Sequence, residues 1–221
     1  MKYRAALFDF DGTLSPSLPL WVRAYQVALL PFDVVVDDDE VRRRCLFKDF
    51  SVVAAHYGRF SAKELEASLE SALPAVFAAA ELFPLARAVV EHCRDHGVQT
   101  ALVTSAPRNI VMGVVDRFRL GELFEFVICG DDVENYKPHP ESLLTTLAAL
   151  KRLPGEALMI GDSWVDVLAG KAAGTRTALY MPTQPDPFHD ATRLRATEPD
   201  YIFEDHSEVP GVLGLPGMAG A

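Results

Sequence analysis

The stretch ALFDFDGTLS, residues 6–15, decides how the rest of the sequence is interpreted. An apolar run, Ala5 to Phe8, leads directly into Asp9 and Asp11, which are separated by a single Phe. Side chains two residues apart share a face of an extended chain, so two carboxylates at the end of a strand would repel each other. The stretch therefore predicts a buried strand that ends on two acids with a chemical task.

Downstream of residue 83, short apolar runs alternate with helical patterns. Strands separated by helices of this length indicate right-handed βαβ units and a parallel sheet with helices on both faces. We therefore expect an α/β fold with a Rossmann-like, doubly wound parallel sheet. The later strands are predicted at 98–104, 126–129, 157–160, 177–180 and 201–203, and the helices at 83–97, 108–119, 140–151 and 164–173.

Residues 15–82 interrupt this alternation, because they contain no convincing strand pattern. The segment Ser61–Glu64 has the form of a capping box, which marks the start of a helix. We therefore expect an α-helical domain at 15–82, inserted into a Rossmann-like core made of residues 1–14 and 83–221. The Gly- and Pro-rich tail, residues 210–221, is expected to be mobile at its end.

The composition indicates which partners the protein can have and in which compartment it works. Lys and Arg total 21 and Asp and Glu total 31, which gives a net charge of −10 and disfavours nucleic acids and anionic membranes as partners. No apolar window approaches the roughly 18 residues of a membrane span, and no signal peptide is expected. The odd number of cysteines, Cys45, Cys93 and Cys129, predicts buried, reduced thiols in a cytoplasmic protein.

Polar groups collect at four places that follow predicted strands. In a parallel α/β sheet, ligands bind outside the carboxyl ends of the strands, so these groups should converge. Several carboxylates crowded together raise one another's pKa unless a cation neutralises them, and Mg²⁺ is a hard ion that prefers oxygen ligands. We therefore expect a Mg²⁺ site among them. The groups are Asp9 with Asp11, Thr104 with Ser105, Lys137 in a loop, and Asp162 with Asp166.

These four places resemble the four motifs of the haloacid dehalogenase superfamily. DFDGTL (9–14) resembles the first motif, DxDGT, and LVTS (102–105) resembles the second. YKPHPE (136–141) is similar to the third motif, and GDSWVD (161–166) to the fourth. The order and spacing fit along nearly the whole chain. The chain looks most like the phosphoglycolate phosphatase and β-phosphoglucomutase branch, whose helical cap lies between the first two motifs, where residues 15–82 lie here.

The resemblance implies a role for each acid of the first motif. Asp9 would attack phosphorus and form an aspartyl-phosphate that water then hydrolyses. Asp11 would protonate the leaving oxygen and later activate the water, while its backbone carbonyl binds the metal. Both residues are thus implied as catalytic groups and as members of the metal site.

The other motifs supply the remaining site residues that the resemblance implies. Thr104 would hold a phosphoryl oxygen, helped by main-chain N–H groups near Ser105, and Lys137 would neutralise charge on the nucleophile and the transferring group. Asp162 would complete the metal site, and Asp166 would reach the ion directly, through water, or by orienting a ligand. For Ser105 two alternatives stay open: a hydrogen bond to substrate, or a cap on the next helix.

Asp11 also separates neighbouring chemistries of the superfamily. Members that cleave carbon–halogen bonds or phosphonates do not keep an acid two places after the nucleophile, so Asp11 favours phosphate esters. The resemblance implies a Mg²⁺-dependent phosphatase acting on phosphoglycolate or a sugar phosphate. The alternatives are a sugar phosphomutase of the β-phosphoglucomutase type and a non-catalytic binding protein on the same fold. The expected partner is a small phosphorylated metabolite, with neither nucleic acid nor membrane, for a monomer or homodimer.

The first motif continues differently from the pattern common in this branch. LSPS (14–17) stands where Val-Asp-Ser usually follows, so an acid is missing at the middle position. This departure leaves the four motifs intact but loosens the assignment to one subfamily. Substrate contacts are expected from the helical insertion, whose polar candidates are Arg23, Arg42 to Arg44, Lys48 and His56.

Overall fold

The computed structural model describes residues 2–183 and 187–218. The chain divides into two compact units: one contains Met1–Pro16 and Leu82–Ala221, and the other is Ser17–Glu81. All strands of the described residues belong to the first unit. Among the same residues, no helix combines the length and the apolar character that crossing a membrane requires.

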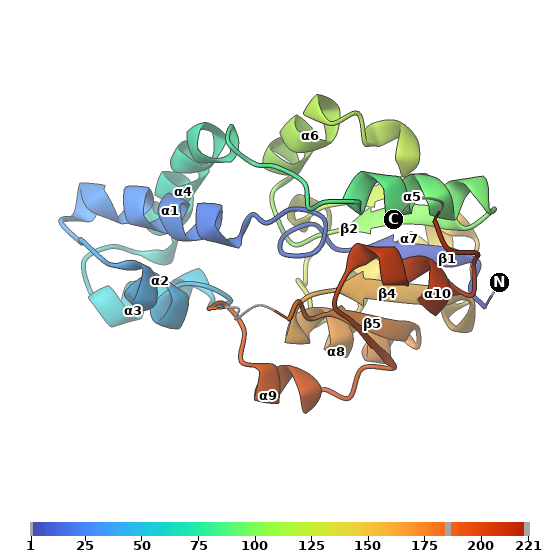
Figure 1. Ribbon diagram of the computed structural model, residues 1–221. Coiled ribbons are helices and arrows are strands. Elements are labelled where there is room, and N and C mark those ends of the chain that lie inside the picture. The colour runs from blue at the N-terminus through green and yellow to red at the C-terminus, as the bar shows by residue number, and fades with distance from the viewer. Residues whose placement is uncertain (1, 184–186, 219–221) are drawn as a thin grey trace. The chain divides into compact units, whose positions relative to one another are not determined.

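A six-stranded parallel sheet forms the centre of the first unit (Figure 1). Its strand order is β3-β2-β1-β4-β5-β6, the doubly wound order of Rossmann-like folds, so the predicted fold class is confirmed. Each predicted strand is present, with ends that differ by no more than one residue. The strands are β1 (Ala5–Phe8), β2 (Gln99–Val103), β3 (Phe126–Ile128), β4 (Ala157–Gly161), β5 (Arg176–Tyr180) and β6 (Tyr201–Phe203).

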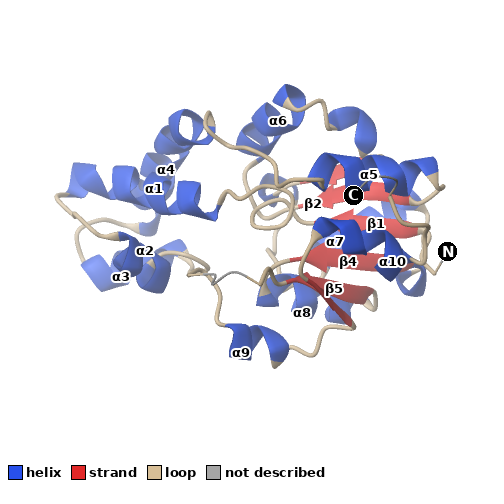
Figure 2. Cartoon of the chain, in the orientation of Figure 1, coloured by secondary structure: helices blue, strands red, loops and turns tan. Residues whose placement is uncertain are grey.

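The strand order reverses at β1, which pairs with both β2 and β4 (Figure 2). The helices before β2 and β3 connect strands on one side of β1 in the sheet. The helices before β4 and β5 connect strands on the other side. Right-handed crossovers then place the two pairs on opposite faces. The first pair is α5 (Ala86–Asp95) and α6 (Arg108–Arg117), and the second is α7 (Glu141–Leu150) and α8 (Trp164–Ala173).

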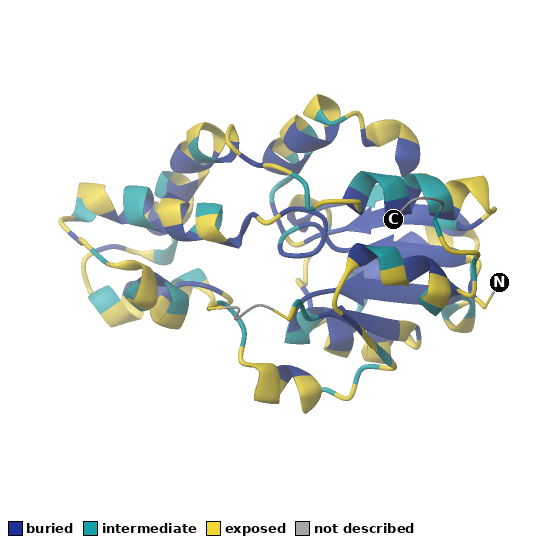
Figure 3. Cartoon of the chain, in the orientation of Figure 1, coloured by how far each residue is buried: buried dark blue, intermediate teal, exposed yellow. Residues whose placement is uncertain are grey.

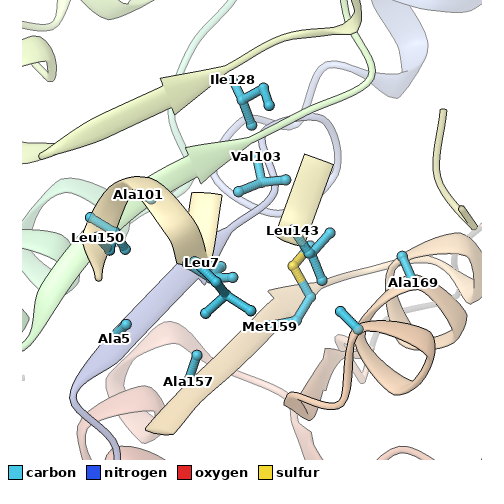
Figure 4. Close-up of a cluster of buried hydrophobic side chains, with 12 residues drawn as sticks. Ala5, Leu7, Ala101, Val103, Ile128, Leu143, Leu150, Ala157, Met159 and Ala169 are labelled. Carbon is cyan, nitrogen blue, oxygen red and sulfur yellow. The ribbon is translucent and has the colours of Figure 1, made fainter. Parts of the chain in front are cut away.

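One cluster of the hydrophobic core lies between the sheet and the second pair of helices. Alternate strand residues point to this face, among them Leu7, Val103 and Met159, and Leu143 of α7 and Ala169 of α8 pack against them (Figure 4). The two central strands β1 and β4 are buried along their whole length and are dark blue in Figure 3. Both faces of β1 are covered, and a carboxylate is costly to bury there. The acids that follow β1 can therefore lie only beyond its carboxyl end, at the edge of the sheet.

Helix α5 begins at Ala86, so the predicted start at residue 83 is wrong. Leu85 adopts φ 64°, a left-handed conformation that a helix cannot include. The preceding Phe83 instead donates its N–H to the carbonyl of Leu14 at 2.9 Å, and this bond ties the segment to the loop after β1. Proline at residue 84 thus precedes a turn and not the first helical turn.

The C-terminal tail is more ordered than its composition indicates. Helix α10 (Val209–Leu213) buries Val209, Pro210 and Leu213, and the Leu213 carbonyl accepts a hydrogen bond from the N–H of Lys2 at 2.9 Å. Residues 219–221, the end that was expected to be mobile, lie outside the described residues. A second short helix that was not predicted, α9 (Ala191–Arg195), lies between β5 and β6.

The second unit consists of helices. Helices α1 and α4 pack together, with the rings of Trp21 and Phe77 edge to face at 5.3 Å. The predicted capping box is present, because Ser61 accepts from the Glu64 N–H at 3.2 Å and the Glu64 carboxylate accepts from the Ser61 N–H at 2.8 Å. The helices are α1 (Leu18–Leu29), α2 (Asp38–Arg44), α3 (Phe50–Tyr57) and α4 (Ala62–Phe77).

Candidate active site

The loop after β1 places Asp9 inside the protein and Asp11 nearer to solvent. The Asp9 N–H donates to the carbonyl of Ile160 at 2.9 Å, which extends the pairing of β1 with β4 by one residue. The chain then turns tightly, since the N–H groups of Leu14 and Ser15 both donate to the carbonyl of Phe10. Asp9 is buried and Asp11 is partly exposed.

Three buried carboxylates converge at this edge of the sheet. Asp9, Asp162 and Asp166 each offer an oxygen, and the three oxygens lie within 4.8 Å of one another. Asp162 directly follows β4, and Asp166 lies in the first turn of α8. This donor set consists of carboxylate oxygens, and a hard cation such as Mg²⁺ prefers oxygen ligands. The predicted contribution of Asp11 used its backbone carbonyl, and its carboxylate does not belong to this group among the described residues.

Lys137 enters the same site from the loop before α7. Its ammonium donates to Asp9 Oδ1 at 2.7 Å, to Asp166 Oδ1 at 2.6 Å and to the carbonyl of Val103 at 3.1 Å. The three protons of the ammonium therefore have three acceptors. Glu141 holds the loop, because its carboxylate accepts from the N–H groups of Glu134 and Asn135 at 2.8 and 3.0 Å.

The electrostatics of the site call for positive charge. Burial raises the pKa of Asp9 well above its ordinary value, and the neighbouring Lys137 opposes this shift. Burial likewise raises the pKa of Asp162 to about 7. Burial disfavours the charge of Lys137, but the carboxylates of Asp166 and Asp9 outweigh it and raise the pKa of the ammonium. One ammonium among three buried acids leaves excess negative charge, which a divalent cation would compensate.

Gly12 makes room for the Asp162 carboxylate. A Cβ atom at residue 12 would lie 1.9 Å from Asp162 Oδ2, and the φ of 78° is itself unfavourable for any other residue. We expect Gly12→Ala to displace this carboxylate and to lower turnover by about 10²-fold, the cost of a misplacement of roughly 1 Å. A phosphatase assay at saturating Mg²⁺ measures the loss.

Gly97→Ala is the matched control for this substitution. Gly97 has φ 76° and no atom within 4 Å of the added Cβ, so only the backbone penalty of about 1–2 kcal/mol applies. Thermal melts of both variants measure the loss of stability from backbone strain. A loss of turnover in Gly12→Ala alone then reports the displacement of the Asp162 carboxylate. Equal turnover in the two variants would contradict the role given to Gly12.

The end of β2 presents Thr104 and Ser105. Thr104 is buried, and its Oγ1 accepts from the N–H of Ala106 at 3.0 Å, so the hydroxyl still has its own proton to donate. Ser105 is exposed and does not cap the following helix. The first N–H of α6, that of Arg108, donates instead to Asp131 Oδ1 at 3.1 Å. Of the two alternatives for Ser105, the helix cap is excluded.

Asp166 has a structural role in addition to its place in the carboxylate group. Ser163 is the N-cap of α8, and its N–H and hydroxyl both donate to Asp166 Oδ2, at 3.1 and 2.5 Å. Asp166 Oδ1 receives Lys137, so both of its oxygens are engaged. Asp162 precedes the N-cap, and its carboxylate is turned toward the site. Asp162 therefore does not cap α8.

Two further residues contact Asp162 that the sequence did not single out for this site. The hydroxyl of Thr13 donates to Asp162 Oδ1 at 3.1 Å. His189, in the loop between β5 and α9, places its Nε2 3.4 Å from Asp162 Oδ2. Thr13 lies inside the first motif, so its position was a usable signal. His189 follows no strand directly and belongs to no motif, so only the folded chain brings it here.

A buried histidine fixes the loop after β1 from the other side. His206 donates from Nε2 to the carbonyl of Thr13 at 2.7 Å, and its ring stacks on Phe83 with a centroid distance of 5.5 Å. A carbonyl can only accept, so Nε2 carries the proton. Burial lowers the pKa of His206, although the Thr13 carbonyl and Asp205 oppose the shift.

This histidine makes stability depend on pH. A base whose pKa is lowered by folding binds protons more readily in the unfolded chain, so its stabilising contribution is complete above the ordinary pKa of 6.5 and is lost as pH falls. We expect the Tm of the native protein to fall more steeply than that of His206→Gln between about pH 7.5 and about pH 5.5. Parallel curves would contradict this, and His96→Gln, at an exposed site, is the control.

Four of the basic side chains in the second unit, Arg42 to Arg44 and His56, take part in ion pairs within it. Glu40 of α2 lies 3.7 Å from Arg43, 4.0 Å from Arg44 and 3.4 Å from His56. Exposed pairs of this kind contribute about 0–1 kcal/mol each. An anionic ligand could therefore compete for these groups at little energetic cost.

Comparison with known proteins agrees with the geometry. The family model for "Haloacid dehalogenase-like hydrolase" matches residues 6–180. Pyrophosphatase PpaX of Anoxybacillus flavithermus is 39% identical over 126 residues, which cover 57% of this chain and 57% of that protein. Phosphoglycolate phosphatase 1 of Pseudomonas aeruginosa is 32% identical over 185 residues, which cover 79% of this chain and 68% of that protein. The chain thus spans little more than half of the first relative and about two thirds of the second.

Solved structures show the same fold. A predicted phosphoglycolate phosphatase from Haemophilus somnus superposes with a TM-score of 0.82 at 20% identity, covering 96% of this chain and 98% of that chain. A candidate β-phosphoglucomutase from Thermotoga maritima gives a TM-score of 0.75 at 24% identity, with the same coverage of 96% and 98%. At these identities the likeness concerns the fold alone.

Proposed function

Since this chain belongs to the haloacid dehalogenase-like hydrolase family, we propose that it is a Mg²⁺-dependent phosphatase that hydrolyses a small phosphorylated metabolite. One observation carries the proposal: Asp9 is buried at the end of β1, bonded to Lys137 at 2.7 Å and grouped with Asp162 and Asp166. A carboxylate in this setting can meet a phosphate ester without repulsion once a cation is bound. In this proposal residues 15–82 act as the cap that selects the substrate.

Asp9 and Asp11 divide the chemistry between them. A carboxylate oxygen of Asp9 forms a bond to phosphorus while the bond from phosphorus to the leaving oxygen breaks, and Asp11 gives its proton to that oxygen. Asp11 then takes a proton from water, whose oxygen attacks the phosphorus of the aspartyl-phosphate. This second step releases inorganic phosphate and restores the Asp9 carboxylate. The partial exposure of Asp11 suits a group that must exchange protons with leaving group and water.

Lys137, Thr104 and Ser105 act on the phosphoryl group. Lys137 already contacts Asp9 Oδ1, so its charge lies where a transferring phosphoryl group would meet the nucleophile. Thr104 has a hydroxyl proton to donate to a phosphoryl oxygen at the end of β2. Ser105 is the next residue and is exposed, so its hydroxyl can donate to the substrate.

The residues present fit a bound Mg²⁺. Asp9 and Asp162 would supply carboxylate oxygens and Asp11 its backbone carbonyl, while Asp166, with both oxygens engaged by Lys137 and Ser163, would orient the site. When bound, the ion neutralises negative charge on the nucleophile and on the phosphoryl oxygens. The pKa values of Asp9 and Asp162, both raised by burial, fit a site that requires this compensation.

Removal of metal tests this proposal. Activity should vanish in EDTA and return with Mg²⁺, and sustained turnover without metal would contradict it. Asp162→Asn should weaken Mg²⁺ binding more than Asp166→Asn, because Asp162 faces the ion and Asp166 acts through its neighbours. A Mg²⁺ titration of turnover in both variants gives the ranking, and the reverse order would show the assignment to be inverted.

An assay of turnover on a panel of phosphorylated metabolites would identify the substrate class. We propose phosphoglycolate or a sugar phosphate, because Phosphoglycolate phosphatase 1 matches over 79% of this chain. Release of inorganic phosphate from one of these esters supports a phosphatase. Conversion of a sugar phosphate into its isomer without release identifies a phosphomutase, and no turnover of any ester identifies a binding protein. The free, buried thiols Cys45, Cys93 and Cys129 are consistent with our proposal of a cytoplasmic enzyme.

A further inference from the structure

His189 occupies an unusual position for a loop residue. It follows β5 and precedes Asp190, the N-cap of α9, yet its side chain is only 4% exposed. Its Nε2 lies 3.4 Å from Oδ2 of Asp162, whose side chain is 6% exposed. At this distance the contact is an ion-pair approach and not a hydrogen bond. A buried imidazole that faces a buried carboxylate is favourable when the ring carries a proton and positive charge.

The Asp162 carboxylate has a polar neighbour at each of its oxygens. Thr13 donates to Oδ1 at 3.1 Å, and His189 lies at Oδ2. Gly12 leaves space at Oδ2 that a Cβ atom would fill. A hydrogen bond from Thr13 and a charged contact from His189 thus act on the two oxygens of this carboxylate. Its orientation decides which oxygen lone pairs face a metal.

We propose that His189 is a positioning residue of the metal centre, which holds the Asp162 carboxylate in the orientation that binds Mg²⁺. The inference rests on the proposed function, because it assigns Asp162 as a ligand. His189 is not itself in the group of donors within 4.8 Å of one another among the described residues, so it acts through Asp162. Outer partners of metal-binding carboxylates typically change metal affinity by about 10–100-fold.

The test is direct metal binding by the full-length protein. Mn²⁺ is the probe, because the electron paramagnetic resonance signal of the free ion reports binding without any turnover, and competition with Mg²⁺ gives the Mg²⁺ affinity. His189→Leu keeps the bulk and removes the polar contact, whereas His189→Gln keeps an N–H that can reach a carboxylate oxygen. His96→Gln changes an exposed histidine at the C-cap of α5 and is the matched control.

We expect His189→Leu to raise the Mg²⁺ dissociation constant by about 10–100-fold, His189→Gln to recover most of the affinity, and His96→Gln to leave it unchanged. Thermal melts without metal verify the fold. If the Leu variant does not fold, His189→Asn, which is polar but shorter, replaces it in the comparison with Gln.

Unchanged or tighter binding in the Leu variant would overturn the inference, as would an equal loss in the Leu and Gln variants. These outcomes differ from a failure of the proposed function. A native protein that binds neither Mn²⁺ nor Mg²⁺ would reject the metal site itself. Native binding that is insensitive to His189 would reject only the positioning role.

Discussion

Replacing Asp9 by Asn is expected to abolish turnover, with a loss on the order of 10⁶-fold, as is typical when a covalent nucleophile is removed. An amide oxygen is a poor nucleophile toward phosphorus, and no aspartyl-phosphate can form on it. The change is nearly isosteric, so contact with the Lys137 ammonium can persist through the amide oxygen. Turnover of an activated aryl phosphate at saturating Mg²⁺ measures the loss.

The control for this variant is Asp116→Asn, which makes the same change on an exposed residue of α6. Its activity should equal that of the native protein. Thermal melts show whether the Asp9 variant folds, which we expect because Lys137 keeps its bond to Asp166 at 2.6 Å. A folded Asp9→Asn protein with full activity would refute the mechanism.

Replacing Asp11 by Asn is expected to lower turnover of a natural ester by about 10²–10⁴-fold, the usual contribution of general acid–base catalysis. The nucleophile remains, but an alkoxide leaving group no longer receives a proton. With a good leaving group the first step needs no acid, so the second step should become limiting and phosphorylated Asp9 should accumulate.

The contrast between substrates makes this prediction specific. The loss should be largest for alkyl phosphates in the first step, and a burst of released aryl alcohol should precede slow turnover of an activated aryl phosphate. An equal loss for both substrates without a burst would show that Asp11 does not transfer protons. The same assays on Asp116→Asn exclude a general effect of lost negative charge.

The sheet was predictable from the sequence because its strands are short apolar runs separated by helical patterns. The convergence of Asp9, Lys137 and Asp162 followed from the same pattern, since parallel strands deliver their carboxyl ends to one edge. The start of α5 was not predictable, because Pro84 fits a helix start and only the conformation of Leu85 moves it to Ala86.

Features that depend on tertiary packing could not be predicted from the sequence. Helix α10 is rich in Gly and Pro, and it is stabilised by burial of Val209 and Leu213 and not by local propensity. His189 is distant from Asp162 along the chain and contacts it only in the folded protein. The spacing of residues along the sequence does not predict a contact between two such distant side chains.

The central claim is that Asp9 carries the phosphoryl group during turnover. Acid quench of Asp11→Asn during hydrolysis of an aryl phosphate, followed by peptide mapping by mass spectrometry, locates that group directly. The account predicts one phosphoryl group on the peptide that contains Asp9, lost on treatment with hydroxylamine as expected of an acyl phosphate. A phosphoryl group on another residue, or product formation with no phosphorylated peptide at any time, would contradict it.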